Sequence, residues 1–269
     1  MEITVHGHDA YIYTGGKSLK TALDAALPAI VFVHGADLDH SCWGLQSRWF
    51  ANHGYAVLAI DLPGHGRSGG EPLAGIAAMA AWLVALLDAA GIARATLIGH
   101  SMGSLAALAT AASFPERVTS IALLGNATPM PVSAALLEAA KNDEPRARNM
   151  INIWSHSPRG QLGGSAVPGM WLTGMNRRLM ERAAPGVLLA DLSACNDYRE
   201  GLEHAARVAC PALILSGSHD QMAPPRATLT LAKDLPGAIR VILEGAGHAM
   251  MSEQPDAVLD ALIAFLARA

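Results

Sequence analysis

Short, mainly apolar runs alternate along the chain with stretches in which apolar residues recur every three or four positions. Apolar runs bounded by glycine or proline are typical of strands buried on both faces, and the wider spacing predicts helices that pack by one side. The runs at residues 29–33, 55–60, 95–98, 118–124, 212–215 and 239–243 are the predicted strands. This alternation predicts an α/β fold with a mostly parallel central sheet flanked by helices on both faces.

The two ends of the chain add one element each. An N-terminal pair, Glu2 to Val5 and Ala10 to Tyr13, predicts an antiparallel hairpin at the edge of the sheet. After Pro255, the residues Val258, Leu262 and Phe265 recur on one helical stripe, so we expect a final helix there.

One connection is too long for simple alternation. About 85 residues separate the strand ending near Gly125 from the strand starting near Pro211, whereas connections usually run about 2–6 residues. The segment has helical spacing interrupted by prolines, and five of the eleven methionines lie in it: Met130, Met150, Met170, Met175 and Met180. We interpret residues 126–206 as an inserted helical cap, and residues 1–125 with 207–269 as the α/β core.

Composition excludes several classes of protein. A chain with 51% hydrophobic and 16% charged residues is not intrinsically disordered. The net charge of −4, without any dense run of Lys and Arg, argues against nucleic acid or an anionic membrane surface as partner. The three cysteines (Cys42, Cys195 and Cys210) form no CxxC pair, which disfavours a disulfide framework or a zinc site.

The expected location is the cytoplasm, and the expected partner is a small molecule. The first residues show no basic and apolar secretion signal. The uncharged stretch 72–87 is shorter than the roughly 20 residues of a membrane span, and the stretch 95–115 contains His100, glycines and hydroxyl residues. A reducing compartment also suits the cysteine pattern. A homo-oligomer is compatible with the sequence.

The pentapeptide Gly99-His100-Ser101-Met102-Gly103 follows a predicted strand and opens a predicted helix. In this context the G-x-S-x-G pattern predicts a nucleophile elbow, a strained turn that projects the serine Oγ out of the sheet. The helix N-terminus that follows favours negative charge developing nearby. Ser101 is therefore the candidate nucleophile.

A serine hydroxyl is a poor nucleophile near neutral pH and needs a base, which an acid orients in turn. Asp220 follows the strand 212–215, and His248 follows the strand 239–243 and precedes the final helix. Both lie where strands of an open α/β sheet end, which is where such sheets place their ligands. We predict Asp220 as the orienting acid and His248 as the base. His219 is adjacent to Asp220 in sequence and cannot easily face it.

Four motifs carry a resemblance to the α/β-hydrolase superfamily that spans nearly the whole chain: Val33-His34-Gly35-Ala36, the segment Asp61 to Ser68, the Ser101 pentapeptide, and Gly247-His248. The resemblance implies an oxyanion hole formed by the backbone N–H groups of Ala36 and Met102, and a supporting role for the segment Asp61 to Ser68. In some relatives the acid follows the strand that ends here at Gly125-Asn126, which carries no carboxylate.

Other polar residues have simpler interpretations. His6, His8 and Asp9 are metal-ligand types without partners on an expected hairpin, so we predict no metal site. Asp37, Asp39 and His40 lie close to Ala36, and they either touch substrate or cap the helix that contains Trp43. Five arginines of the cap either hold an acidic substrate or form a solvated face: Arg146, Arg148, Arg177, Arg178 and Arg182.

Departures from subfamily patterns narrow the function. A serine at the elbow disfavours epoxide hydrolases and haloalkane dehalogenases, and the segment after Val33 lacks the HGGG and HGGPG patterns of other subfamilies. The chain is similar to bacterial carboxylesterases and enol-lactonases with a small helical cap. We expect a cofactor-independent serine hydrolase that cleaves a small or medium carboxylic ester through an acyl-enzyme.

Three alternatives remain open. The same residues could open a lactone such as that of 3-oxoadipate enol-lactone, which arginines pointing into the pocket would favour. They could cleave a carbon–carbon bond in a dienoic acid. They could also form a hormone-receptor-like protein that binds a small ligand with an intact triad.

Overall fold

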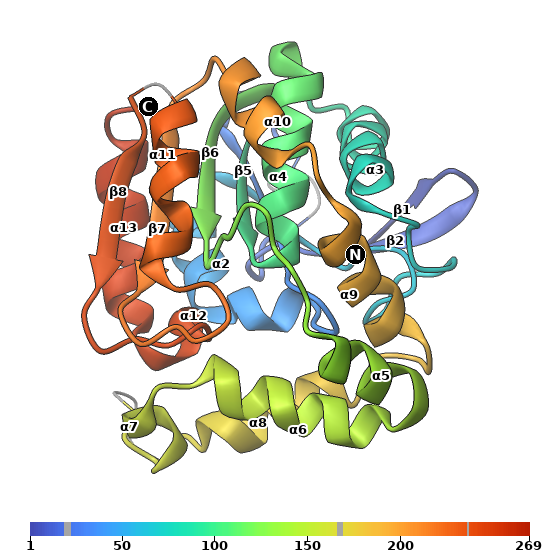
Figure 1. Ribbon diagram of the computed structural model, residues 1–269. Helices are drawn as coiled ribbons and strands as arrows, with labels where there is room; N and C mark the ends of the chain where they lie inside the picture. The colour runs from blue at the N-terminus through green and yellow to red at the C-terminus, as the bar shows by residue number, and fades with distance from the viewer. Residues whose placement is uncertain (19–22, 166–168, 236) are drawn as a thin grey trace.

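The computed structural model describes residues 1–18, 23–165, 169–235 and 237–269. Its centre is an eight-stranded sheet in the order β1-β2-β4-β3-β5-β6-β7-β8 (Figure 1). The strands are β1 (Glu2–Val5), β2 (His8–Tyr13), β3 (Ala29–Val33), β4 (Ala56–Ile60), β5 (Ala95–His100), β6 (Val118–Leu124), β7 (Ala212–Gly217) and β8 (Ile239–Leu243). The strands β3 to β8 pair in parallel, and β2 joins β4 antiparallel. The mostly parallel α/β sheet is thus confirmed, with ends within two residues of those expected.

Helices cover both faces of the sheet. One face packs against α3 (Ile76–Ala89), α4 (Met102–Ser113), α10 (Gly201–Arg207) and α11 (Leu229–Asp234), and the other against η1 (His40–Trp43), α2 (Gly44–Ala51), α12 (Met250–Glu253) and α13 (Pro255–Leu266). On the second face Phe32 contacts the rings of Trp43 and Phe50, which are fully buried. Two short 3-10 turns complete the core, η2 (Pro115–Arg117) and η3 (Pro225–Thr228).

The strand β8 differs from the expectation of burial on both faces. It forms the outer edge of the sheet, and Ile242 is 49% exposed. Only alternate residues of β8 pack inward, because α13 covers one side of this strand. The apolar run therefore predicted the strand correctly, but it did not show whether the strand was central or at the edge of the sheet.

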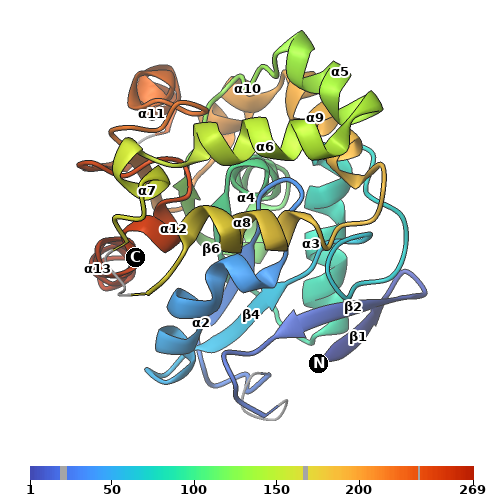
Figure 2. The same cartoon turned by 90° about the horizontal axis from the view of Figure 1, so that it is seen from below.

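The long connection is helical, and it lies at the carboxyl ends of the strands (Figure 1). It contains α5 (Ala134–Asn142), α6 (Glu144–Ser155), α7 (Pro158–Gln161), α8 (Leu172–Met180) and α9 (Val187–Asp197). Figure 2 shows α6 and α8 side by side across this end of the core. Side chains of α5, α6, α8 and α9 share one small hydrophobic cluster.

The helices at the end of the connection also contact the core. Cys195 and Tyr198, at the end of α9, and Ala205 of α10 share a hydrophobic cluster with α4. The division into a cap of residues 126–206 and a core of the remainder stays a prediction. In the described part of the chain, no helix combines the length and apolar character needed to cross a bilayer.

Candidate active site

Ser101 stands at the sharp turn between β5 and α4. Its φ of +52° lies in a region that non-glycine residues rarely adopt, so the backbone is strained there. The glycines on either side permit the turn: a Cβ at Gly99 would lie 2.1 Å from the Gly103 carbonyl oxygen, and one at Gly103 would lie 2.4 Å from the Val33 carbonyl oxygen. The structure thus has the strand–turn–helix geometry of a nucleophile elbow around Ser101.

The loops after β7 and β8 bring Asp220 and His248 together, although 28 residues separate them in sequence. Nδ1 of His248 donates to Oδ2 of Asp220 across 2.7 Å. The backbone N–H groups of Met222 and Ala223 donate to the other carboxylate oxygen, at 2.9 and 2.7 Å. Burial raises the pKa of Asp220, but the His248 ring and these hydrogen bonds outweigh it, so its pKa lies below the ordinary value. The carboxylate is therefore ionised, and Nε2 of His248 is left available as a base.

The position after β6, which could have carried an acid, lies against the same imidazole. A Cβ at Gly125 would lie 2.9 Å from Cε1 of His248. Asn126 turns away: its Nδ2 donates to Ser104 Oγ at 2.8 Å. Among the described residues, Asp220 is the carboxylate within hydrogen-bond distance of His248.

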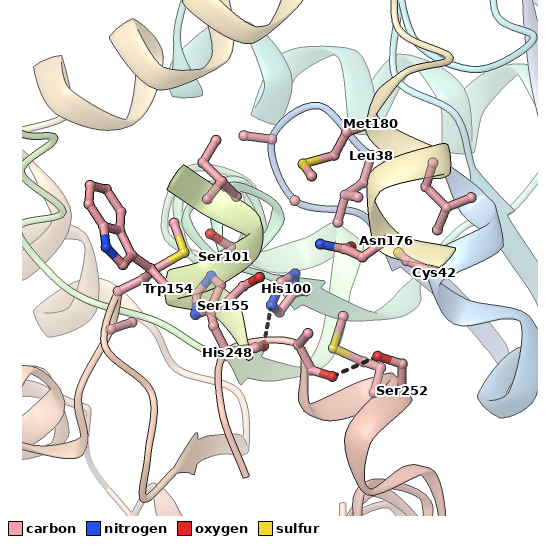
Figure 3. A pocket seen from close by; sticks show the side chains of 18 of the residues that line it. Leu38, Cys42, His100, Ser101, Trp154, Ser155, Asn176, Met180, His248 and Ser252 are labelled. Carbon is pink, nitrogen blue, oxygen red and sulfur yellow. Dashed lines mark hydrogen bonds between the residues drawn. The ribbon is translucent and has the colours of Figure 1, made fainter. Parts of the chain in front are cut away.

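Ser101 and His248 line the same pocket, which has a volume of about 580 Å³ and lies between the cap and the carboxyl ends of the strands (Figure 3). His100 lies beside them, and its Nε2 donates to the His248 carbonyl oxygen at 3.0 Å. Burial lowers the pKa of His100 to about 3, so this ring is neutral. His100 therefore acts as a fixed donor that holds the His248 loop, rather than as a second base.

Methionines form much of the pocket wall. The lining methionines are Met130, Met170, Met175, Met180, Met222 and Met251. Four of them belong to the cap segment, which contains five of the eleven methionines of the chain. Met102 and Met250 are buried in the core.

The geometry around Ala36 and Met102 suits two backbone donors. Met102 is the first residue of α4, and the first N–H groups of a helix have no partner within the helix. The Gly35 carbonyl accepts from Nδ1 of His34 at 2.8 Å, while Nε2 of His34 accepts from the Leu62 N–H at 3.1 Å. Because the C=O and N–H of a trans peptide point in opposite directions, the Ala36 N–H points away from the His34 ring. Burial lowers the pKa of His34 to about 4, which keeps this tautomer neutral.

The residues after Ala36 have structural partners. Asp39 caps the 3-10 turn that contains Trp43, because its Oδ1 accepts from the Ser41 N–H at 2.7 Å. Asp39, His40 and Asp61 have metal-ligand atoms within 4.8 Å of one another. The Asp61 oxygens, however, already accept from the His40 ring at 2.7 Å and from the Arg67 N–H at 2.9 Å. This group is a hydrogen-bonded support for the loop.

Four of the five cap arginines pair with acidic residues. Arg148 bonds Asp37 at 2.8 Å, Arg177 and Arg178 bond Glu181, and Arg182 reaches Asp39 at 3.2 Å. None of them is among the described residues that line the pocket, and neither is Arg146. His219 is exposed and lies outside this pocket as well.

Sequence patterns did not reveal the buried carboxylate of Glu253. It accepts from the N–H and hydroxyl of Ser157, the N-cap residue of α7, and from the Gly247 N–H at 3.2 Å. Next to it, the Ala249 N–H donates to the Ser155 carbonyl oxygen at 2.8 Å. Glu253 thus joins the cap to the loop that carries His248. A charged residue shortly after the Gly247-His248 motif was the available signal, but its partner lies 96 residues away in sequence.

Comparison with known proteins agrees with this geometry. The model of the "Alpha/beta hydrolase family" matches residues 30–261. A 2-hydroxy-6-oxononadienedioate/2-hydroxy-6-oxononatrienedioate hydrolase from Burkholderia vietnamiensis is 29% identical, over 89% of this chain and 87% of the relative. A non-heme chloroperoxidase from Streptomyces lividans is 31% identical, over 88% of this chain and 91% of the relative.

Among solved structures, the enol-lactonase from Burkholderia xenovorans LB400 superimposes with a TM-score of 0.87 and 24% identity, covering 99% of this chain and 100% of that one. The likeness extends over the sheet and the helical connection, and it agrees with the fold that the four sequence motifs predicted. This chain belongs to the alpha/beta hydrolase family.

Proposed function

We propose that this hydrolase cleaves carboxylic esters through an acyl-enzyme formed on Ser101. The observation that carries the proposal is that Ser101 and His248 line the same pocket, and that His248 is hydrogen-bonded to the ionised Asp220. A serine in a strained turn, a base beside it and a buried acid that orients the base are the parts that nucleophilic acyl transfer requires.

The proposed chemistry has two half-reactions. The Ser101 Oγ attacks the ester carbonyl carbon while Nε2 of His248 takes the hydroxyl proton. The tetrahedral oxyanion is held by the N–H groups of Ala36 and Met102, and removing one such donor costs about 10²–10³-fold in kcat in serine hydrolases. Collapse of this intermediate breaks the carbon–oxygen bond, and the alcohol leaves with the proton from His248. Water then attacks the acyl-enzyme with the same base, which releases the acid and regenerates Ser101.

The pocket wall favours a neutral acyl group. Six methionines and several leucines line it, and the five cap arginines do not. Among the described lining residues, Arg48 is the one arginine, and its Nε donates to the Tyr13 hydroxyl at 2.8 Å. A carboxylate-bearing substrate would thus find few positively charged side chains in the pocket, and burying an unpaired carboxylate is unfavourable.

Carbon–carbon bond hydrolysis is the second candidate. A relative with 29% identity bears the name of a dienedioate hydrolase, and an α/β hydrolase with the same serine–histidine–aspartate arrangement could act on such a substrate. Lactone opening is supported in the same way by the structural similarity to an enol-lactonase. The composition of the pocket wall is the reason to rank neutral esters first.

A fluorophosphonate probe and a substrate panel test the proposal. Intact-mass analysis should show a single adduct, and peptide mapping should place it on Ser101. The panel comprises p-nitrophenyl butyrate, 3-oxoadipate enol-lactone and a dienoic acid substrate. Ser101→Ala should remain folded and lose several orders of magnitude in ester hydrolysis. An adduct at another residue, or full turnover by Ser101→Ala, would contradict the proposal.

A further inference from the structure

The loop of residues 34–38, here called the oxyanion loop, is fixed at two successive peptides. The first peptide is held through the Gly35 carbonyl, which accepts from His34 Nδ1 at 2.8 Å and from the Leu38 N–H at 3.3 Å. The second is held through the Asp37 N–H, which donates to Oδ2 of Asp191 at 2.8 Å. Asp37 has a φ of +57°, a strained conformation for a non-glycine residue, and such strain persists only where the surroundings enforce it.

Asp191 reaches the oxyanion loop from far away in the sequence. It belongs to α9 and lies 154 residues after Asp37. Its neighbours in the helix are apolar (Leu188, Leu189, Ala190 and Leu192), so its side chain is a single carboxylate on an otherwise apolar stretch. The carboxylate is buried, and the Asp37 N–H is one of the two partners that it has among the described residues.

The other partner is a charged histidine. Nε2 of His65 donates to the same Asp191 oxygen at 2.8 Å, and Nδ1 of His65 donates to the Pro63 carbonyl oxygen at 2.9 Å. Because both ring nitrogens face acceptors, the ring carries two protons. Burial lowers the pKa of His65, but Asp191 and these hydrogen bonds outweigh it and raise the pKa above its ordinary value. A buried ion pair therefore lies beneath the oxyanion loop.

Stability alone gives a weak reason for this arrangement. Apolar residues of similar volume often replace a buried ion pair without loss of stability. What an apolar residue at position 191 would lack is the acceptor for the Asp37 N–H. An oxyanion donor is effective only when its direction is fixed before the charge develops. The peptide that Asp191 fixes is the next one along the chain from the Ala36 N–H.

We propose that Asp191 is a positioning residue for the oxyanion hole: its carboxylate holds the Asp37 N–H and thereby the direction of the neighbouring Ala36 N–H. This inference rests on the proposed ester hydrolysis at Ser101. It also makes the hole depend on the cap segment, because α9 supplies the carboxylate. Arg148 of α6 adds a second link, through its bond to the Asp37 side chain.

Two substitutions at the same position separate the acceptor from the charge. Asp191→Asn removes the charge but keeps an oxygen for the Asp37 N–H, whereas Asp191→Leu removes both. The matched control is Asp197→Asn, at an exposed aspartate of the same helix. Asp191→Leu alone could destabilise the fold, because it leaves the charged His65 ring buried without its partner. A second pair of variants avoids this: His65→Gln with Asp191→Leu is compared with His65→Gln alone.

The readouts are the kinetics with p-nitrophenyl butyrate and the hydrogen exchange of a peptide that spans residues 34–38. Asp191→Leu should lower kcat on the order of 10- to 100-fold with little change in KM, because the missing interaction acts on the transition state. Its exchange in the oxyanion loop should accelerate. Asp191→Asn should retain kcat within about fivefold, and Asp197→Asn should match the wild type in both measurements.

Equal losses of kcat in the Asn and Leu variants would overturn the inference, and so would a loss in Asp191→Leu without faster exchange at residues 34–38. An unchanged kcat in Asp191→Leu, in an enzyme that hydrolyses the ester and is labelled at Ser101, would overturn it while the proposed function stands. A wild type that neither hydrolyses esters nor labels at Ser101 would overturn both.

Discussion

Asp220 and His248 are joined by a 2.7 Å hydrogen bond from the ring Nδ1 to a carboxylate oxygen. The pKa of the Asp220 carboxyl group lies below its ordinary value. The other carboxylate oxygen is saturated by two backbone N–H groups of the same loop, so the acid cannot turn away from the imidazole. In addition, Nε2 of His100 donates to the backbone carbonyl of His248. The imidazole is thus fixed before substrate arrives, with Nε2 facing away from Asp220.

Replacement of Asp220 by asparagine tests this relationship. Asp220→Asn should lower kcat about 10⁴-fold, because the amide favours the wrong tautomer and cannot balance the imidazolium that forms. Asn126→Ala is the matched comparison at the alternative position after β6. It removes buried hydrogen bonds to Ser104 and Thr128, so it should destabilise by about 1–3 kcal/mol and leave kcat nearly intact. Steady-state kinetics with urea unfolding measure both, and the reverse ranking would place the acid elsewhere.

The strands and the elbow could be predicted because their signals are local. An apolar run ending in Gly99, followed by Ser101 and a helical pattern, specifies strand, turn and helix without reference to the rest of the chain. Asp220 and His248 could be placed because the carboxyl ends of parallel strands meet at one edge of the sheet. Whether β8 is an edge strand depends on what packs beside it, which its own residues do not specify. The apolar run therefore did not predict that Ile242 is exposed.

The supporting contacts could not be predicted in the same way. Asp191 and Glu253 act through partners 154 and 96 residues away, and no spacing rule connects such pairs. A buried carboxylate on an apolar stretch of a helix, such as Asp191 in α9, indicates that some buried donor exists, but not which one. The pairing of Arg148 with Asp37 likewise depends on how α6 of the cap packs against the loop that contains Asp37.

Replacement of Glu253 tests whether its contact with the cap stabilises the loop that carries His248. Glu253→Gln exchanges an acceptor for an amide that must face the N–H groups of Ser157 and Gly247. Hydrogen bonds to a buried charge contribute about 1.5–3 kcal/mol each, so we expect a fall in Tm together with a several-fold lower kcat as Gly247 and His248 loosen. Glu244→Gln, at an exposed glutamate of the same region, should change neither. A wild-type Tm in Glu253→Gln would contradict the assignment.

The free energy of unfolding should depend on pH through the titration of Asp37. Burial raises its pKa to about 6, against the attraction of Arg148. An acid with a higher pKa in the folded state than in the unfolded chain (about 3.9) binds its proton more tightly when folded, so deprotonation costs stability as pH rises from about 4 to 6. The difference amounts to at most about 3 kcal/mol.

Urea unfolding across pH 4 to 8 measures this dependence. Relative to Asp37→Asn, the wild type should lose unfolding free energy up to about pH 6 and then run parallel to the variant. Asp197→Asn should follow the wild type throughout. Parallel curves for the wild type and Asp37→Asn over the whole range would mean that Asp37 titrates as an ordinary aspartate.

The methionine-lined chamber predicts how activity depends on acyl chain length. Methionine side chains are flexible and polarizable, so they adapt to varied apolar shapes. Along a series of p-nitrophenyl esters, each buried methylene should add up to about 0.8 kcal/mol of transition-state stabilisation, about fourfold in kcat/KM, until the pocket is full. Trp154 lines the pocket and Trp171 is 73% exposed, so Trp154→Ala should move the optimum to longer chains and Trp171→Ala should not. An ester with a terminal carboxylate, such as p-nitrophenyl hemisuccinate, should be poorer than the butyrate, because none of the five cap arginines is among the described residues that line the pocket. A flat series, with a carboxylate-bearing lactone far better than any ester, would contradict this interpretation and favour lactone opening.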